Sequence, residues 1–192
     1  MLDQAAKLIL DVAFGVVVYS LLIRFLMQLM RAPFRNPLGQ AVMALTDWIV
    51  KPLRKLLPGF GGVDWATLVA AFVLQVAWLL ALYALLGRGF ALGGAGVAFV
   101  LAAALLELAK TTIWILILVV IAQAVLSWVA PDGPLAGLLN ALTFPFLRPL
   151  RRFIPPLGGS LDLTPLILIV LLQLVLILPV AWLERLLATL LR

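Results

Sequence analysis

The stretch KPLRKLLPGFGGVDW, residues 51–65, recurs later in the chain as RPLRRFIPPLGGSLDL, residues 148–163. Both copies carry three cations, then prolines, a glycine pair and an aspartate in the same order. Each copy lies between two long apolar stretches. A motif repeated with its surroundings indicates an internal duplication, in which each half is a span, a basic connection and a second span.

The composition is that of a bilayer protein. Of the 192 residues, 66% are hydrophobic and 11% are charged, whereas soluble proteins are about 25% charged. The chain has no cysteine and no histidine, which excludes disulfides, thiolate nucleophiles and the common zinc and haem ligands. No convergent set of nucleophile, base and metal ligands is visible, so we expect neither an enzyme nor a cofactor.

Four apolar segments are long enough to cross about 30 Å of hydrocarbon, which takes about 20 helical residues. They are residues 8–30, 65–86, 111–130 and 163–187. The stretch 90–108 is also apolar but richer in alanine and glycine, and Glu107 and Lys110 at its end are spaced as an ion pair on one helix face.

The basic connections predict the topology. Lysine and arginine are retained on the cytoplasmic side, so both connections are expected there. The fold class is then all-α, a multi-pass membrane protein of two tandem parallel repeats, each with a span, an amphipathic interfacial helix, a basic proline-rich loop and a second span. We expect a first repeat over 1–88, a connecting interfacial or re-entrant helix over 89–110, and a second repeat over 111–192. The connecting segment could also extend the following span.

An alternative topology makes 90–108 a fifth span. It would invert the second half and place Arg148, Arg151 and Arg152 outside, against the charge rule.

The chain before each basic motif has a helical apolar pattern. Asn36 followed by Pro37 is typical of a helix start. The expected first-copy stripe is Leu38, Ala41, Val42, Leu45 and Ile49, and the second follows Pro134 with Leu135, Leu138, Leu139 and Leu142. We expect both helices to lie flat with their leucines toward the bilayer, and to stop or kink at Pro52 and Pro149.

The repeated cations are candidate binding residues for anionic lipid or for a partner: Lys51, Arg54, Lys55, Arg148, Arg151 and Arg152. Near an anionic leaflet each contributes about 1 kcal/mol, or roughly 3 kcal/mol per copy. The simpler interpretation is an orientation anchor, which needs no specific ligand.

The repeated aspartates, Asp64 and Asp162, follow the glycine pair and precede a span. This position is typical of an N-cap, whose carboxylate accepts hydrogen bonds from free helix amides. A cation ligand or proton carrier is the alternative function.

Three further polar positions lie within the apolar segments. Gln75 and Gln173 are placed about 16 Å along their spans, near the bilayer midplane, and are expected to face protein as structural hydrogen-bonding groups or to line a hydrophilic path. Arg24 is expected either to extend toward the basic connection or to pair with an acid such as Asp64. Its counterpart in the second repeat is Gln123.

The run RFLMQLMRAPFRNPLGQAVMALTDWIVKPLRKLLPGFGGVDW, with its echo LSWVAPDGPLAGLLNALTFPFLRPLRRFIPPLGGSLDLTPLILIVLLQ, resembles the duplicated YggT family of bacterial membrane proteins, related to YlmG proteins. The resemblance implies a multi-pass protein of the bacterial plasma membrane without established enzymatic activity. It also implies links to osmotic stress and cation uptake, to cell division and membrane organisation, and in plastids to cytochrome assembly.

Two functions follow as hypotheses. One is a non-enzymatic membrane scaffold or assembly factor that uses its basic amphipathic connections. The other is a component of osmotic-stress or cation transport. Anionic lipids are the expected partners, nucleic acid is not, and a membrane or cytoplasmic protein partner and a homo-oligomer both stay open.

Overall fold

The computed structural model describes residues 2–85, 94–133, 135–154 and 162–189, and these fold into helices joined by short connections. Their bounds are α1 Leu2–Leu29, α2 Pro37–Leu56, α3 Trp65–Leu85, α4 Gly94–Val129, α5 Ala136–Phe153, α6 Thr164–Val175, the π-helical η1 Leu176–Val180 and α7 Ala181–Thr189. Within the described residues no β-strand forms. The predicted all-α class is confirmed.

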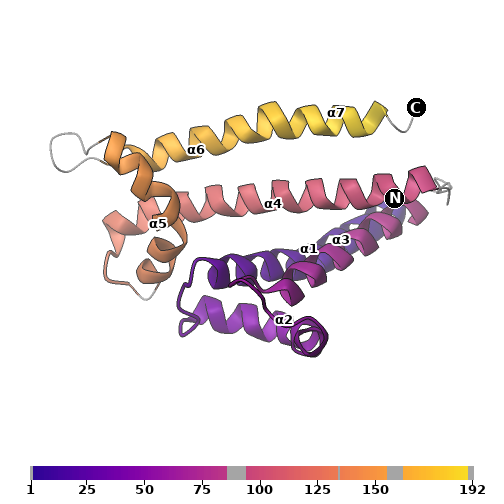
Figure 1. Ribbon diagram of the computed structural model, residues 1–192, viewed down its shortest axis with the longest axis horizontal. Coiled ribbons are helices and arrows are strands. Elements are labelled where there is room, and N and C mark those ends of the chain that lie inside the picture. The colour runs from indigo at the N-terminus through magenta and orange to yellow at the C-terminus, as the bar shows by residue number, and fades with distance from the viewer. Residues whose placement is uncertain (1, 86–93, 134, 155–161, 190–192) are drawn as a thin grey trace.

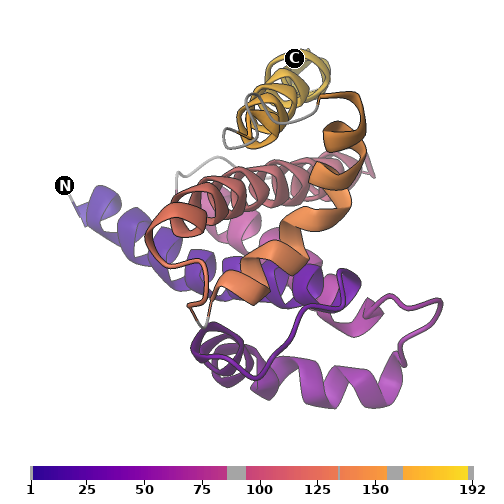
Figure 2. The ribbon, with the colours of Figure 1, turned by 90° about the vertical axis from the view of Figure 1, so that its left-hand side faces the viewer.

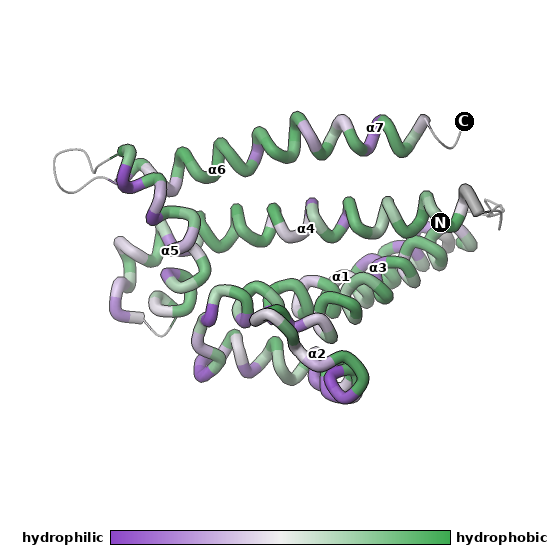
Figure 3. Tube along the Cα trace, in the orientation of Figure 1, coloured by the Kyte–Doolittle hydropathy of each residue, from purple (hydrophilic) through white to green (hydrophobic). Residues whose placement is uncertain are grey.

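The long helices run side by side, with both ends of the chain on the right of Figure 1, α5 on the left and α2 along the bottom. We call the end that carries α2 and α5 the connector end. The four candidate spans among the described residues are Gln4–Leu29, Trp65–Leu85, Gly96–Val129 and Thr164–Thr189. Figure 3 shows these helices as predominantly hydrophobic, with many hydrophilic residues on α2 and α5. The chain is therefore a membrane protein whose two repeats run in the same direction.

The stretch predicted as a separate connecting helix belongs to α4. Residues Gly94–Val129 form one helix of 36 residues, about 54 Å long at 1.5 Å per residue. The expected boundary between 110 and 111 falls inside it, so a separate interfacial or re-entrant helix was the wrong choice. The other expectation, an extension of the following span, matches the structure. Residues 90–93 lie outside the described residues.

Helix α2 begins as the sequence predicts but ends later. The Asn36 side chain accepts a hydrogen bond from the Gly39 amide at 2.8 Å, and Pro37 occupies the first turn. The helix then continues through Pro52 to Leu56, so the proline stop was wrong. Pro52 has no N–H to donate to the Trp48 carbonyl one turn earlier. Both residues are exposed, so water can hydrate this carbonyl instead.

Helix α5 likewise continues through Pro145 and Pro149 to Phe153. The repeated cations consequently lie in the last turns of two helices rather than in loops after them. The proline expected to open the second helix, Pro134, and the second glycine pair at 158–159 lie outside the described residues.

Helix α5 packs against protein through the face that the sequence assigned to lipid, whereas α2 buries a different face from the predicted stripe. Helix α5 buries Leu138, Leu139, Leu142 and Leu147, so its leucines face the helix bundle. Helix α2 buries Gly39, Val42, Thr46 and Val50, whereas Leu45 is 44% exposed. A Cβ at Gly39 would lie 2.5 Å from the Phe34 carbonyl oxygen, so this close approach requires glycine.

The main core joins both repeats. Leu21, Leu22 and Met27 of α1 pack with Ala70 and Ala71 of α3 in a cluster of nearly inaccessible side chains, which also takes in residues of α4 and α5. Figure 2 shows α5 crossing from the end of α4 toward α6. The last span is the least enclosed, with 11% of its apolar window buried against 28% in the first, so most of its surface is left to lipid.

The shared connector end predicts a labelling pattern. The chain has no cysteine, so single cysteines can be introduced at the exposed positions Lys55, Arg152, Gln4 and Arg185. Lys55→Cys and Arg152→Cys are expected to react with a membrane-impermeant maleimide from one side, and Gln4→Cys and Arg185→Cys from the other. Reaction of Lys55→Cys and Arg152→Cys from opposite sides would contradict the parallel arrangement.

Candidate functional site

In the first repeat, an arginine at the end of α2 is bonded to the aspartate that begins α3. Gly61 and Gly62 adopt positive φ angles of 64° and 81°, which glycine tolerates, and turn the chain toward α3. Asp64 then accepts hydrogen bonds from the Thr67 amide at 3.4 Å and the Thr67 hydroxyl at 2.5 Å, which is N-cap geometry. Its other contact is Arg54, whose Nη2 lies 2.5 Å from Oδ2.

The second repeat makes the same link with the corresponding residues. Arg151 at the end of α5 lies 2.9 Å from Asp162 through Nη2 and 3.0 Å through Nε. Asp162 accepts from the Thr164 amide at 2.9 Å, and α6 begins at Thr164, so this aspartate stands one residue before the formal cap, Leu163. We call these two contacts the arginine–aspartate links.

The two links differ in burial. The Asp64 side chain is 1% exposed, whereas that of Asp162 is 29% exposed. Arg54 also donates to the Gln28 side chain of α1 at 3.0 Å. The first link therefore ties three helices together, and the second ties two.

Both aspartates stay ionised at neutral pH. Burial raises the pKa of Asp64, but hydrogen bonds from Arg54 and Thr67 outweigh it and hold the pKa below its usual value. Burial likewise raises the pKa of Asp162, and bonds from Thr164 and Arg151 outweigh it. Because both pKa values are lowered on folding, the links stabilise the fold above the ordinary carboxyl pKa of 3.8, and this contribution is lost as pH falls through the lowered values.

The other repeated cations lie near the links on exposed surface. Lys55 and Arg152 are exposed and make no ion pair with a described residue. Lys51 is 71% exposed and pairs with Asp47, one turn earlier, at 2.8 Å. Arg148 lies over the Phe144 ring, 5.6 Å from its centroid. Each connecting helix therefore uses one arginine for a link and presents the other cations outward.

Arg24 pairs with a different acid from the one the sequence suggested. It is 4% exposed and donates to Asp47 at 2.8 Å and to the Thr46 hydroxyl at 2.7 Å, rather than to Asp64. Burial raises the pKa of Asp47, but bonds from Lys51 and Arg24 hold it below its usual value. The i,i+4 spacing of Asp47 and Lys51 on α2 is a signal that could have identified this acid.

The two midplane glutamines do not meet. Gln75 is 9% exposed, whereas Gln173 is exposed, and no hydrogen bond joins them. The expectation that both face protein fails for Gln173, because the last span is little enclosed.

Gln75 faces a cavity of about 360 Å³ between α1, α3 and α4. Asp11, which accepts a hydrogen bond from Trp78 Nε1 at 3.0 Å, also lines this cavity, as do Glu107 and Thr111. Gln75 makes no hydrogen bond with another described residue. A buried amide without a partner is expensive, so this cavity suits water or a polar solute.

Glu107 and Lys110 form the expected pair at 3.0 Å, and Lys110 also contacts Glu184 of α7 at 2.5 Å. The sequence analysis missed Glu184, although an acid inside a span signals the need for a partner. Among the described residues no group of three metal-binding side chains gathers.

Comparisons with known proteins agree with this repeated architecture. The model of the CCB3/YggT family matches residues 4–85 and again residues 102–183. The chain belongs to the CCB3/YggT family. The second match begins inside α4, so the family unit includes part of the stretch predicted as a connection. No solved structure matches the chain.

Relatives are similar over most of their length. An uncharacterized protein of Pseudomonas aeruginosa is 35% identical, covering 91% of this chain and 87% of the relative. An uncharacterized protein of Vibrio alginolyticus is 33% identical, covering 88% and 90%. The uncharacterized protein YggT of Escherichia coli is 33% identical, covering 81% and 78%. These CCB3/YggT relatives carry names that assign no activity.

The unequal burial of the two links predicts unequal effects of breaking them. Arg54→Gln leaves a buried carboxylate unpaired and is expected to cost about 3 kcal/mol, as for other buried pairs that lose one partner. Arg151→Gln is expected to cost less, because Asp162 keeps access to water. Thermal unfolding of the purified variants checks this order, and equal losses would contradict it.

Proposed function

We propose that this CCB3/YggT protein is a non-enzymatic organiser of the bacterial plasma membrane, whose two amphipathic connecting helices gather anionic lipid on the cytoplasmic face. The proposal rests on one observation: in both α2 and α5, one arginine is held by an aspartate while the other cations are exposed. One arginine in each helix, Arg54 or Arg151, is held by an aspartate. The remaining cations, Lys51, Lys55, Arg148 and Arg152, are exposed at the connector end.

Exposed apolar side chains near these cations also favour an interaction with the membrane surface. Trp48 and Leu56 lie on the first connecting helix and Phe60 follows it, and Phe144 and Phe153 lie on the second. Large apolar groups beside cations are typical of helices that lie in the headgroup region. Because the links fix each helix to the start of the next span, the two basic ends are rigid parts of the bundle. A protein partner with an acidic surface is the further expectation for this scaffold.

The exposed cations can be tested against an exposed neutral position. The variant with Lys51, Lys55, Arg148 and Arg152 all changed to Gln is expected to lose enrichment of fluorescent phosphatidylglycerol around the protein in giant vesicles, because the attraction is electrostatic. The wild-type enrichment should also fall with added salt. A control with the exposed polar residue Gln40 changed to Ala should keep it. Enrichment that survives the fourfold neutralisation would refute the proposal.

A second candidate function, a component of cation or osmotic-stress transport, is favoured by the cavity beside Gln75. Its unpartnered amide and the carboxylates of Asp11 and Glu107 share this space inside the bundle. Polar groups within spans commonly mark solute or proton pathways.

The transport candidate predicts flux that depends on this cavity. In proteoliposomes, isotope uptake of a monovalent cation should be abolished by Gln75→Leu. It should be kept by Gln173→Leu, because Gln173 is exposed away from the cavity. No uptake under any imposed gradient, or equal uptake by both variants, would rule the candidate out.

A further inference from the structure

The second repeat departs from the first where its helices meet. Aligning the two copies on Arg24 and Gln123, and on Asp64 and Asp162, pairs these residues of the first and second repeats: Phe25 with Ala124, Gln28 with Ser127, Ala70 with Leu168 and Ala71 with Ile169. Compared with the first repeat, α4 has two smaller side chains, Ala124 and Ser127. Helix α6 has two larger ones, Leu168 and Ile169. The same fold therefore packs differently in its two halves.

In the first repeat the small residues lie at the contact. Ala70 and Ala71 are fully buried against α1, in one cluster with Leu21 and Leu22. Small residues let two membrane helices approach closely. In the second repeat Leu168 and Ile169 stand at these positions, and Ile121, the counterpart of Leu22, is 44% exposed. Leu168 is buried in a cluster with Val120 of α4 and Leu147 of α5, so a large side chain rather than an alanine makes this contact.

A groove of about 540 Å³ opens between these helices. Away from the connector end its lining is apolar, with Ile121 of α4 and Leu166 and Ile169 of α6. Its mouth at the connector end is polar, with Gln123, Ser127 and the Arg151–Asp162 link. From Ser127 to Ile121 the groove extends about 9 Å along α4.

The mouth contains polar groups that the protein leaves unsatisfied. The Gln123 side-chain oxygen is buried without a hydrogen-bond partner. In the first repeat Gln28 accepts from Arg54, but its counterpart Ser127 is too short to do the same and donates to the Ala124 carbonyl instead. Arg151 bonds to Asp162 through Nε and Nη2, which leaves Nη1 free for an anionic oxygen.

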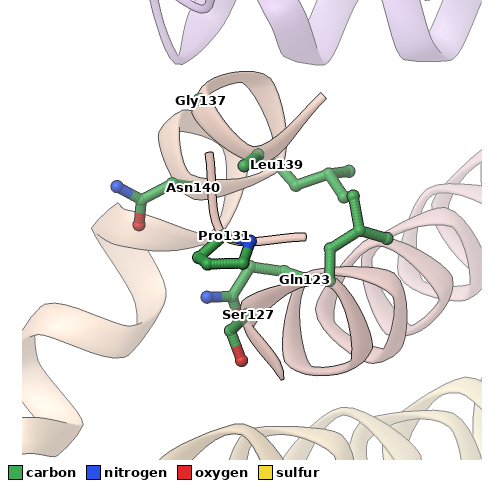
Figure 4. Close-up of a pocket in the computed structure, with 8 residues that line it drawn as sticks. Gln123, Ser127, Pro131, Gly137, Leu139 and Asn140 are labelled. Atoms are coloured by element: carbon green, nitrogen blue, oxygen red, sulfur yellow. The ribbon is translucent and has the colours of Figure 1, made fainter. Parts of the chain in front are cut away.

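Gln123 and Ser127 also border a second cavity, of about 260 Å³, on the side of α5. Figure 4 shows their polar ends beside this space, with Asn140 of α5 across from them. Gln123 and Ser127 therefore lie between the groove and this second space.

We propose that this groove binds one anionic phospholipid, with its phosphate at Arg151 in the place that Gln28 fills in the first repeat. One acyl chain lies between α4 and α6, along Ile121 and Ile169. Charge selects an anionic occupant, because Arg151 at the mouth keeps Nη1 free for an anionic oxygen. The apolar side chains of Ile121, Leu166 and Ile169 select a chain-bearing ligand over free phosphate. The inference does not rest on the proposed function, since it concerns a single stoichiometric site rather than diffuse attraction to exposed cations.

The experiment restores the residues of the first repeat to the second. Ala124→Phe fills the groove, and Ser127→Gln offers Arg151 the amide that Arg54 already has. Val170→Phe is the matched control, because it adds similar bulk at an exposed position of α6 that does not line the groove. Native mass spectrometry in neutral detergent counts bound lipid with phosphatidylglycerol, phosphatidylcholine or inorganic phosphate as the probe.

The proposal predicts one phosphatidylglycerol per wild-type chain and at least about tenfold weaker binding of phosphatidylcholine, which corresponds to ~1.4 kcal/mol. Ala124→Phe and Ser127→Gln should each weaken phosphatidylglycerol binding by a similar factor, while Val170→Phe leaves it unchanged. If Ala124→Phe disturbs folding, the binding measured for Ser127→Gln still tests the proposal. The variant with Lys51, Lys55, Arg148 and Arg152 changed to Gln should still bind one lipid, which separates this site from the proposed function.

Equal binding of the two lipids, or unchanged binding in both groove variants, would overturn the proposal. Binding of phosphate alone as tightly as lipid would overturn the acyl-chain assignment. A wild-type dimer that Ala124→Phe dissociates, with no bound lipid, would assign the groove to a second copy of the chain instead.

Discussion

Each half of the molecule depends on a contact between an arginine at the end of a connecting helix and an aspartate at the start of the next span. The aspartate has free helix amides to satisfy and favours the positive end of the helix dipole. The arginine compensates the charge that this position buries. Arg54 and Arg151 thereby fix the direction in which α2 and α5 leave the bundle. The same contact explains why both copies of the motif carry an aspartate soon after their cations, 10 residues after Arg54 and 11 after Arg151.

The two repeats share this contact and differ in what surrounds it. In the first repeat, Arg24 and Asp47 add a partly buried ion pair, and alanines close the space between α1 and α3. In the second repeat, Gln123 and Phe144 replace the charged pair, and the helices leave a groove. The first half is thus the more completely packed part. The second half retains surfaces and polar atoms that the protein itself does not satisfy.

Much of the fold follows from the sequence because the duplication supplies two observations of each feature. The spans, the parallel direction and the caps all appear twice, and apolar length alone sets the number of crossings. The proline stop failed because propensity treats proline as a helix breaker, while Pro52 and Pro149 stand where the missing bond costs little. The lipid-facing leucines of α5 failed because an apolar stripe indicates burial without saying whether lipid or protein covers it.

The candidate site was predictable in its residues but not in its pairing. From charge alone, Arg54 and Arg151 could not be told apart from the other cations. The glycine turn that brings Asp64 next to Arg54 is visible only in the folded chain. A double-mutant cycle of Arg54→Gln and Asp64→Asn, measured by unfolding of the purified protein, tests this link most directly. We expect a coupling energy of at least about 1 kcal/mol, because substitutions of two neighbours in one charged network do not have additive effects. Additive effects of the two substitutions would show that the link does not hold α2 to α3.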